Sequence, residues 1–245
     1  FKVDRSKITR YPGFNLIYDS TPVNPSKTSF EITDGRIAVA TSEGEVVPTG
    51  TAYGCTQLVV KDTESGIIRV IPIGVMPEGR VAVPQVASGE SYNIALKADG
   101  TVWAWGCNEH GQLGDGTSGS GTEKAIPVQV KGAAGNGYLT NVVAVAAGYN
   151  HSMALKTDGT VWAWGRNARG ELGNGTTTQS TVPVQVKGES GIGYLSDAVS
   201  IAAGANHSIA LKSDGTVWAW GNGVDGQLGD GTSGVGVDKS TPVQV

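Results

Sequence analysis

The sequence contains one twelve-residue segment three times, and this repetition constrains the fold more than any other feature. The segment reads Ala-Leu-Lys-x-Asp-Gly-Thr-Val-Trp-Ala-Trp-Gly and occupies residues 95–106, 154–165 and 210–221. Eleven of the twelve positions agree in all three copies. A segment that recurs at a nearly fixed period indicates an array of similar structural units, so single residues must be interpreted within that array.

Each copy lies inside a longer unit that predicts four β-strands. An apolar run ending in glycine comes first, and a second run leads into Asp-Gly, which favours a type I′ hairpin because that turn needs positive φ. The Val-Trp-Ala-Trp strand follows, and Pro-Val-Gln-Val supplies the fourth strand after a glycine-rich turn and a loop. The glycines that end the first runs are 59 and then 56 residues apart. This pattern is typical of β-propeller blades, which we expect at residues 85–141, 142–197 and 198–245.

The two tryptophans of each copy are separated by one residue, so both should point to the same face of their sheet. We interpret this face as packing against a neighbouring blade, with an aromatic platform for a ligand as the alternative. The aspartates of Asp-Gly are interpreted as turn residues. The residues assigned to this repeat framework are Trp103, Trp105, Trp162, Trp164, Trp218, Trp220, Asp99, Asp158 and Asp214.

Residues 85–245 resemble the regulator of chromosome condensation repeat in its bacterial form. The resemblance rests on Ala-Ala-Gly-x-Asn-His-Ser-x-Ala-Leu-Lys before the hairpin turn and Gly-Gln/Glu-Leu-Gly-Asp/Asn-Gly-Thr after the tryptophans, although the first copy departs at residues 87–93. It implies a propeller, usually of seven blades. Three are present, so we expect the array to be truncated at Val245, with about four more blades needed to close the ring. An open arc would expose strand edges and favour self-association.

Residues 1–84 differ in composition, because they contain no tryptophan and no copy of the repeat. Short apolar runs separated by turn-forming residues predict a small antiparallel β-sandwich, which loosely resembles bacterial immunoglobulin-like modules. A linker that contains proline and glycine places the domain boundary near residue 84. The predicted strands are residues 14–18, 36–41, 57–61 and 67–73.

The charge balance argues against a polyanionic partner. Residues 85–245 carry nine basic and thirteen acidic side chains, and the whole chain has a net charge of −4. Affinity for a phosphate backbone comes from many lysine and arginine contacts, so neither nucleic acid nor an anionic membrane is expected as a partner. The sequence has no run of 18 apolar residues, so we expect no membrane insertion.

No catalytic constellation or cofactor site is predicted. Catalysis needs a tuned acid, base or nucleophile beside a partner, and no such pair recurs in a plausible relation. His151 and His207 occupy the same repeat position, but the first copy has Tyr92 there. A structural hydrogen-bonding role is therefore favoured over a ring of histidine ligands.

Metal and redox chemistry are not predicted either. Asp115, Asn174 and Asp230 share one position in the glycine-rich turn, but a calcium loop brings several carboxylates together and each copy offers one side chain. Cys55 and Cys107 lie in different predicted domains and outside any Cys-x-x-Cys pair. Two separate thiols are favoured, and a bridge between them is left open.

The positions at which the repeats disagree are the candidates for partner binding, because propellers carry function on variable loops above a constant framework. The copies differ immediately after the tryptophan strand, and two blade connections each contain a tyrosine that either anchors a partner or packs the loop. The candidates are Glu109, His110, Arg166, Arg169, Val224, Asp225, Tyr138 and Tyr194.

Together these observations predict a non-enzymatic module that binds an unidentified protein or cell-surface ligand through the loops at the blade ends. The resembled family includes a guanine-nucleotide exchange factor for a small GTPase, so exchange or regulatory activity is one alternative. Carbohydrate or cell-wall binding is another. The immunoglobulin-like resemblance and the style of the repeats predict a bacterial protein that is secreted or displayed at the cell surface, with a cytoplasmic location left open.

Overall fold

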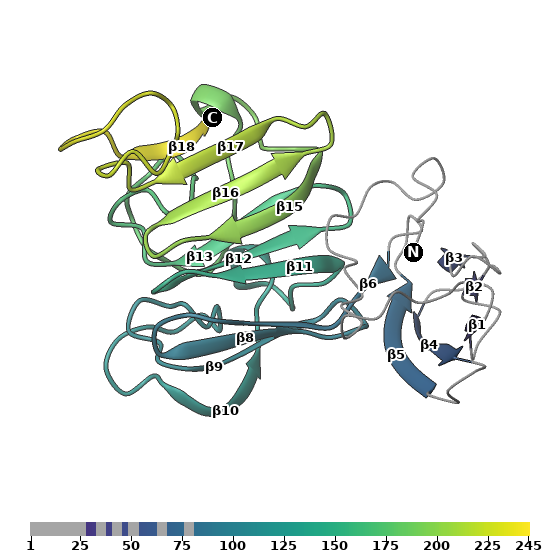
Figure 1. Cartoon of the computed structure of the whole chain (residues 1–245). Helices are drawn as coiled ribbons and strands as arrows, with labels where there is room; N and C mark the ends of the chain where they lie inside the picture. The colour runs from purple at the N-terminus through teal and green to yellow at the C-terminus, as the bar shows by residue number, and fades with distance from the viewer. Residues whose placement is uncertain (1–27, 33–37, 41–45, 49–53, 63–67, 76–80) are drawn as a thin grey trace.

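The computed structural model of the 245-residue chain describes residues 28–32, 38–40, 46–48, 54–62, 68–75 and 81–245. These residues form β-strands, loops and two short 3-10 helices. From residue 85 onward the strands form three four-stranded antiparallel sheets, which are stacked on one another (Figure 1). The described part of the chain is therefore all-β.

The N-terminal strands form a separate four-stranded antiparallel sheet and a two-stranded ribbon. The predicted strands at 57–61 and 67–73 fall largely within β4 and β5, and part of 36–41 forms β2, while 14–18 lies outside the described residues. The sequence pattern missed β1 and β3. An immunoglobulin-like sandwich remains a prediction. The sheet has the order β1 (Thr28–Ile32), β4 (Gly54–Asp62), β5 (Ile68–Val75) and β6 (Val81–Ala82), and the ribbon pairs β2 (Ala38–Ala40) with β3 (Val46–Pro48).

Each of the other three sheets is an antiparallel meander, which we call blades 1, 2 and 3. Two 3-10 helices, η3 (Ala133–Gly135) and η4 (Glu189–Gly191), lie in the connections between blades. Blade 1 consists of β7 (Gln85–Ser88), β8 (Tyr92–Leu96), β9 (Val102–Gly106) and β10 (Lys124–Gln129). Blade 2 consists of β11 (Val142–Ala147), β12 (His151–Lys156), β13 (Val161–Gly165) and β14 (Ser180–Gln185). Blade 3 consists of β15 (Ala198–Ala203), β16 (His207–Lys212), β17 (Val217–Gly221) and β18 (Lys239–Gln244).

The hairpin between the second and third strands of each blade forms as predicted, but the predicted type I′ turn is wrong. In blade 1, Gly100 N donates to Lys97 O at 3.0 Å and Lys97 N donates to Thr101 O at 2.9 Å, which makes a three-residue loop. Gly100 has φ +74°, whereas Asp99 is not among the residues with positive φ. This is a type I turn followed by a left-handed glycine. The other two hairpins repeat the same two hydrogen bonds.

The aspartate of this turn holds the next strand through a short chain of hydrogen bonds. Asp99 Oδ1 accepts from Thr101 N at 3.0 Å and from Thr101 Oγ1 at 2.6 Å. Trp103 Nε1 then donates to Thr101 Oγ1 at 3.2 Å. Blades 2 and 3 contain the same chain. The constant Asp-Gly-Thr-Val-Trp sequence thus specifies both the turn and the position of the first tryptophan.

The two ends of each blade carry different segments. In blade 1, Tyr92 pairs with Gly106 and Leu96 pairs with Val102, so the Asp-Gly turn and the segment after Gly106 lie at opposite ends. We call the end with residues 107–123, 166–179 and 222–238 the loop face. The other end, with the Asp-Gly turns and the blade connections 131–141 and 187–197, is the turn face.

The hydrophobic core lies between successive blades. One cluster joins the inward side chains of blade 1 to Ala154 and Trp164 of blade 2. A second cluster joins blade 2 to Ala210, Trp218 and Trp220 of blade 3. Because blade 2 is covered by blade 1 on one face and by blade 3 on the other, its strands β11 and β12 lack a simple alternation of buried and exposed residues.

Candidate functional site

The structure divides the predicted partner-binding residues between the two ends of the blades. The six residues that follow the tryptophan strands lie on the loop face, whereas Tyr138 and Tyr194 lie on the turn face, where each pairs with a lysine that follows the last strand of the preceding blade. One partner could contact both groups only by reaching around the blades. The loop face and the turn face are therefore separate candidate sites.

Arg166 is partly buried and makes a contact within the array. In the first interface between blades, Gln112 Nε2 donates to Asn150 Oδ1 at 3.3 Å. The equivalent of Gln112 in blade 2 is Glu171, which has no amide to donate, and here Arg166 donates to Asn206 Oδ1 at 3.2 Å instead. Glu171 thus replaces the glutamine donor, and Arg166 restores the hydrogen bond to the asparagine oxygen.

The buried carboxylate of Glu171 is only partly satisfied. Its Oε2 accepts from Arg169 N at 2.7 Å, which keeps the backbone contact that the equivalent glutamines make. Its Oε1 is the one buried side-chain oxygen or nitrogen without a hydrogen bond among the described residues. Sequence reasoning missed this residue because Gly-Gln/Glu-Leu-Gly was interpreted as one turn pattern.

Arg169 also makes a contact between blades. Its Nη1 lies 3.0 Å from Asp238 Oδ2, in the last loop of blade 3. Asp238 Oδ1 in turn accepts from Gly223 N at 3.1 Å. Both members of the ion pair are partly exposed, so the pair is worth at most about 1 kcal/mol. It nevertheless links the blade 3 loop to the loop of blade 2 on the loop face.

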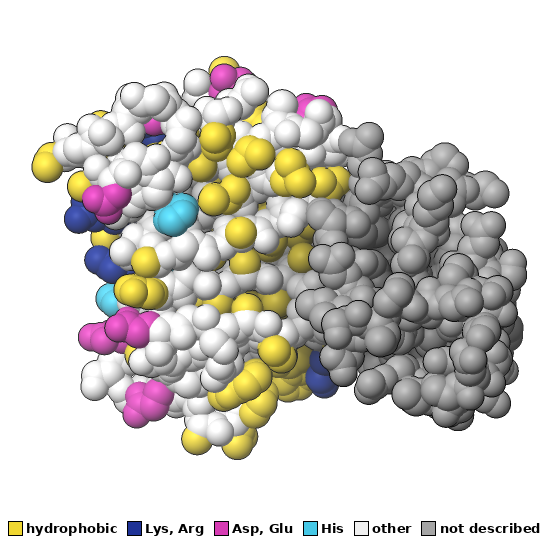
Figure 2. Space-filling model, in the orientation of Figure 1, with side chains coloured by type: hydrophobic (Ala, Val, Ile, Leu, Met, Phe, Trp, Pro, Cys, Tyr) yellow, Lys and Arg dark blue, Asp and Glu magenta, His cyan; other side chains and the backbone are white. Residues whose placement is uncertain are grey.

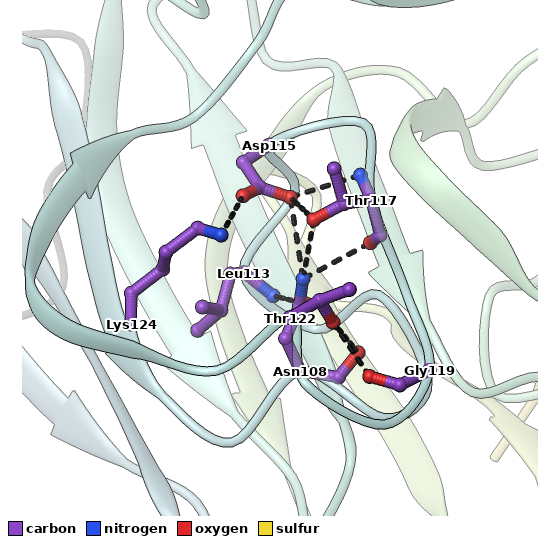
Figure 3. A network of polar contacts seen from close by, with 7 residues as sticks. All are labelled: Asn108, Leu113, Asp115, Thr117, Gly119, Thr122 and Lys124. Atoms are coloured by element: carbon purple, nitrogen blue, oxygen red, sulfur yellow. Dashed lines mark hydrogen bonds and ion pairs between the residues drawn. The ribbon is translucent and has the colours of Figure 1, made fainter.

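An asparagine that the sequence analysis did not select organises the loop of blade 1 (Figure 3). Asn108 Nδ2 donates to Thr117 O at 3.0 Å and to Asp115 Oδ1 at 3.2 Å, and Asn108 Oδ1 accepts from Leu113 N at 3.1 Å. Lys124 Nζ lies 3.7 Å from Asp115 Oδ2. Asn167 repeats the arrangement in blade 2. This network gives Asp115 a structural role in the turn.

The loop face presents its variable side chains above this framework. Glu109 and Asp225 are exposed, and His110 and Val224 are half-buried. Val235, at the tip of the blade 3 loop, is 98% exposed and lies between two glycines with positive φ. Figure 2 shows charged side chains of both signs and a histidine toward the loop ends of the blades. An apolar tip beside mixed charges is suited to recognition of a protein surface.

The turn face presents two equivalent tyrosines. Tyr138 is 58% exposed and Tyr194 is 54% exposed. Lys187 Nζ lies 4.7 Å from the centre of the Tyr194 ring, so one face of this ring is already occupied. Ile192, which is 80% exposed, lies in the same connection as Tyr194. These residues form a second exposed apolar surface.

A buried serine and histidine meet between blades 2 and 3, but their hydrogen bonds exclude nucleophilic activation. His151 Nε2 lies 3.0 Å from Ser208 Oγ, and Ser208 Oγ donates to Glu171 O at 2.8 Å. Because the serine proton is directed to the carbonyl, the histidine must donate to the serine rather than accept its proton. Both side chains are buried. The pair therefore joins two blades and does not form a catalytic site.

The pKa of His151 is lowered to about 3, chiefly by burial and secondarily by the positive charges of His207 and Arg166. The unfolded chain would bind a proton below about pH 6.5, whereas the folded chain would not until about pH 3. Stability is therefore expected to be highest above pH 6.5 and to fall as the pH drops toward 3, by about 1.4 kcal/mol per pH unit from this residue.

The variant His151→Tyr tests this expectation, because the first repeat has a tyrosine, Tyr92, at the same position. We expect urea denaturation to show that the free energy of unfolding falls less steeply in this variant as the pH drops from 6.5 to 3.5. A residual slope should remain from His207, whose pKa is also lowered by burial. Equal slopes in the two proteins would contradict the buried neutral state of His151.

The described residues contain no group of three or more His, Cys, Asp or Glu side chains arranged to hold a metal ion. Cys107 is a free thiol. No helix in the described ranges is long and apolar enough to cross a membrane.

Three stacked antiparallel meanders, joined by a core between the sheets, define an array of β-propeller blades. The family model of the regulator of chromosome condensation (RCC1) repeat matches residues 99–155, 158–211 and 214–245, which together make up more than half of the chain. A second model of the same repeat matches 84–112, 142–171 and 198–227. The chain belongs to the RCC1 repeat family, as its sequence predicted.

Curated relatives share these repeats within longer proteins. The ultraviolet-B receptor UVR8 of Arabidopsis thaliana is 31% identical over 176 residues, which are 71% of this chain and 36% of the receptor. The human E3 ubiquitin-protein ligase HERC2 is 34% identical over 150 residues, which are 61% of this chain and 3% of the ligase. The chain thus spans about a third or less of these relatives.

Solved structures support the same fold. Prp20p from Saccharomyces cerevisiae, described with its binding to Gsp1p and histones, has a TM-score of 0.54 at 24% identity, covering 82% of this chain and 52% of Prp20p. Human WBSCR16 has a TM-score of 0.53 at 24% identity, with 78% and 50% covered. These likenesses show that the repeats share the fold of RCC1-like proteins. The predicted count of seven blades goes beyond these comparisons and stays a prediction.

Proposed function

We propose that this chain is a non-enzymatic interaction module that binds a partner protein through the loop face of its blades. The observation that carries the proposal is the contrast between a constant framework and variable loop-face residues. Within each blade the turn and the tryptophan strand are held by the same hydrogen bonds, whereas Glu109, Asp225 and Val235 differ from their equivalents in the other blades. Variation on a rigid framework is how propellers carry recognition.

Two observations support a smaller recognition surface within the loop face. Arg166 and Arg169 contact blade 3, so both contribute to the array before any partner arrives. Glu109, Asp225 and the tip residue Val235 are exposed. An exposed apolar side chain on the same face as charged groups suits an interface in which a small hydrophobic anchor is surrounded by a polar rim.

Site-specific photo-crosslinking tests the proposal by comparing the two ends of the blades. A photoreactive amino acid is placed at position 109, 225 or 235 on the loop face and, as the matched control, at position 138 or 194 on the turn face. We expect covalent complexes with the same cellular protein from the loop-face positions, and at least a tenfold lower yield from the turn-face positions. Complexes that arise only at positions 138 and 194 would overturn the assignment.

Guanine-nucleotide exchange is a second candidate, favoured by the similarity in fold to Prp20p, whose binding to Gsp1p has been described. The test is the rate at which purified Gsp1p releases fluorescent GDP when this chain is added. If a large molar excess of the chain does not accelerate GDP release, exchange on this GTPase is ruled out.

Carbohydrate or cell-wall binding remains an alternative, supported by the exposed Tyr138 and Tyr194 of the turn face. The test is retention of the chain on insoluble polysaccharide. If alanine at both tyrosines leaves the retention unchanged, these residues do not have the assigned role. Export to the cell surface and the absence of a nucleic-acid partner likewise stay predictions.

A further inference from the structure

Three asparagines in the chain are followed directly by glycine: Asn136, Asn174 and Asn222. In such a pair the backbone nitrogen of the glycine can attack the side-chain carbonyl carbon, Cγ, of the asparagine, because glycine has no side chain to obstruct the approach. The new C–N bond closes a succinimide ring, and the side-chain amide leaves as ammonia. The reaction needs a free backbone nitrogen, a free carboxamide and a peptide group that can rotate.

The fold opposes this reaction at Asn174. Asn174 Oδ1 accepts from Thr176 N at 3.1 Å and from Thr176 Oγ1 at 2.8 Å, so its carboxamide is held in the turn. The nitrogen that would attack, Gly175 N, donates to Ser240 O at 2.9 Å. Both reacting groups must therefore break hydrogen bonds before they can meet.

Asn222 is restrained in the same way. Its Oδ1 accepts from Val224 N at 3.0 Å, and Gly223 N donates to Asp238 Oδ1 at 3.1 Å. Gly223 is also buried, and a methyl group on it would lie 2.8 Å from Val237 O. The peptide group between Asn222 and Gly223 is therefore both hydrogen-bonded and tightly packed.

Asn136 has none of these restraints. It is exposed and directly follows η3, in the connection between blades 1 and 2. Its carboxamide makes no hydrogen bond within the described ranges, and the same holds for Asn136 O and Gly137 N of the following peptide group. Asn136 has ψ 126°, so this peptide group must rotate before Gly137 N can reach Cγ. The rotation breaks no hydrogen bond to any described residue, and a methyl group on Gly137 would meet no heavy atom within 4 Å.

We propose that Asn136 is a site of deamidation in the folded protein, and that the fold protects Asn174 and Asn222 from the same reaction. Hydroxide removes the proton of Gly137 N as this nitrogen bonds to Asn136 Cγ, and the leaving amide takes up a proton from water to become ammonia. Water then opens the succinimide at either carbonyl group, which gives aspartate or isoaspartate at position 136. One water is consumed and one ammonia is released, and no oxidant, reductant or cofactor is needed.

The modification changes the charge of the turn face. Residues 131–141 contain Lys131 and no acidic residue, so a carboxylate at position 136 lowers the charge of this connection from +1 to zero. The new charge lies two residues before the exposed Tyr138. The equivalent connection, residues 187–197, has Ile192 in place of Asn136 and cannot change in this way. This inference is independent of the partner proposed for the loop face.

Peptide mapping by mass spectrometry tests the proposal with the 245-residue chain. The folded chain is incubated at mildly alkaline pH, where the backbone amide loses its proton more easily, and is digested at acidic pH so that the digestion adds no deamidation. We expect the deamidated fraction at Asn136 to grow at least tenfold faster than at Asn174 or Asn222, because only the latter two must first open locally. Fragmentation that distinguishes isoaspartate from aspartate should find both products at position 136.

The chain unfolded in guanidinium chloride provides the reference, because all three pairs are then free and should react at similar rates. Asn136→Ile is the matched variant, since Ile192 has nearly the same backbone conformation in the next connection, with φ −86° and ψ 124° against −87° and 126°. This variant should lose the rapid release of ammonia from the folded chain. Equal rates at the three sites of the folded chain would overturn the proposal. So would an Asn136 that stays intact in the folded chain while the unfolded chain reacts.

Discussion

Replacement of Trp164 by alanine is expected to lower the free energy of unfolding by about 3–5 kcal/mol, the range for removal of a buried tryptophan. The Trp164 side chain is fully buried between blades 1 and 2, and its indole donates to Gln112 O. The loss therefore combines a large cavity with a missing hydrogen bond. Urea denaturation followed by circular dichroism measures the change.

The matched control is Trp105→Ala, which alters the same repeat position in blade 1. Trp105 is partly exposed and its indole makes no hydrogen bond among the described residues, so we expect a loss of about 1 kcal/mol. Trp164→Phe separates the two contributions, because it removes the indole donor and keeps most of the ring. Gln112 O still accepts from Ser152 in that variant, so the cost should be about 1 kcal/mol. Equal losses for Trp164→Ala and Trp105→Ala would contradict the packing role assigned to the interface.

Gly148→Ala is expected to lower the free energy of unfolding by about 3 kcal/mol. A methyl group on this residue would lie 2.7 Å from Gly204 O and even closer to the ring of His151. Gly148 does not have positive φ, so the cost arises from the lack of space and not from backbone strain. Urea denaturation followed by circular dichroism measures this change as well.

A double substitution identifies the cause. In the background His151→Ala the ring that a methyl group would meet is absent, so Gly148→Ala should cost at least about 1 kcal/mol less than it does alone. If the two losses simply add, the clash with His151 is not the reason why this position has glycine. The next repeat offers an independent repetition, because Gly204 has the same relation to His207.

The blade framework could be predicted from the sequence because its determinants are local and repeated. Asp-Gly-Thr-Val-Trp contains the turn, the hydrogen bonds from Asp99 to Trp103 and the start of the third strand within a few residues. The turn type could not be predicted in the same way. Asp-Gly is compatible with both a two-residue and a three-residue loop, and the pairing of Lys97 with Thr101 selects the longer one.

The loop-face residues were harder to interpret because their contacts are distant in sequence. Arg166 and Arg169 vary between repeats, which suggested partner binding, but their contacts with Asn206 and Asp238 lie 40 and 69 residues away. The separation of Tyr138 from Glu109 depends on strand direction, which a list of variable residues does not include. Val235 was missed because it lies within a loop that was treated only as a difference in length.

In each interface between blades, a tryptophan and a serine donate directly to one carbonyl of the preceding blade. This arrangement affects how such an array can gain or lose repeats. Blade 1 meets blade 2 with the same groups that blade 2 uses to meet blade 3. Loss of one complete unit, such as residues 142–197, would therefore bring compatible tryptophan, serine and carbonyl groups together again, but it would remove the contacts of Arg166 and Arg169 with blade 3. We therefore expect the core contacts between blades to tolerate a change by one whole repeat, whereas the loop-face contacts of Arg166 and Arg169 are specific to their repeat.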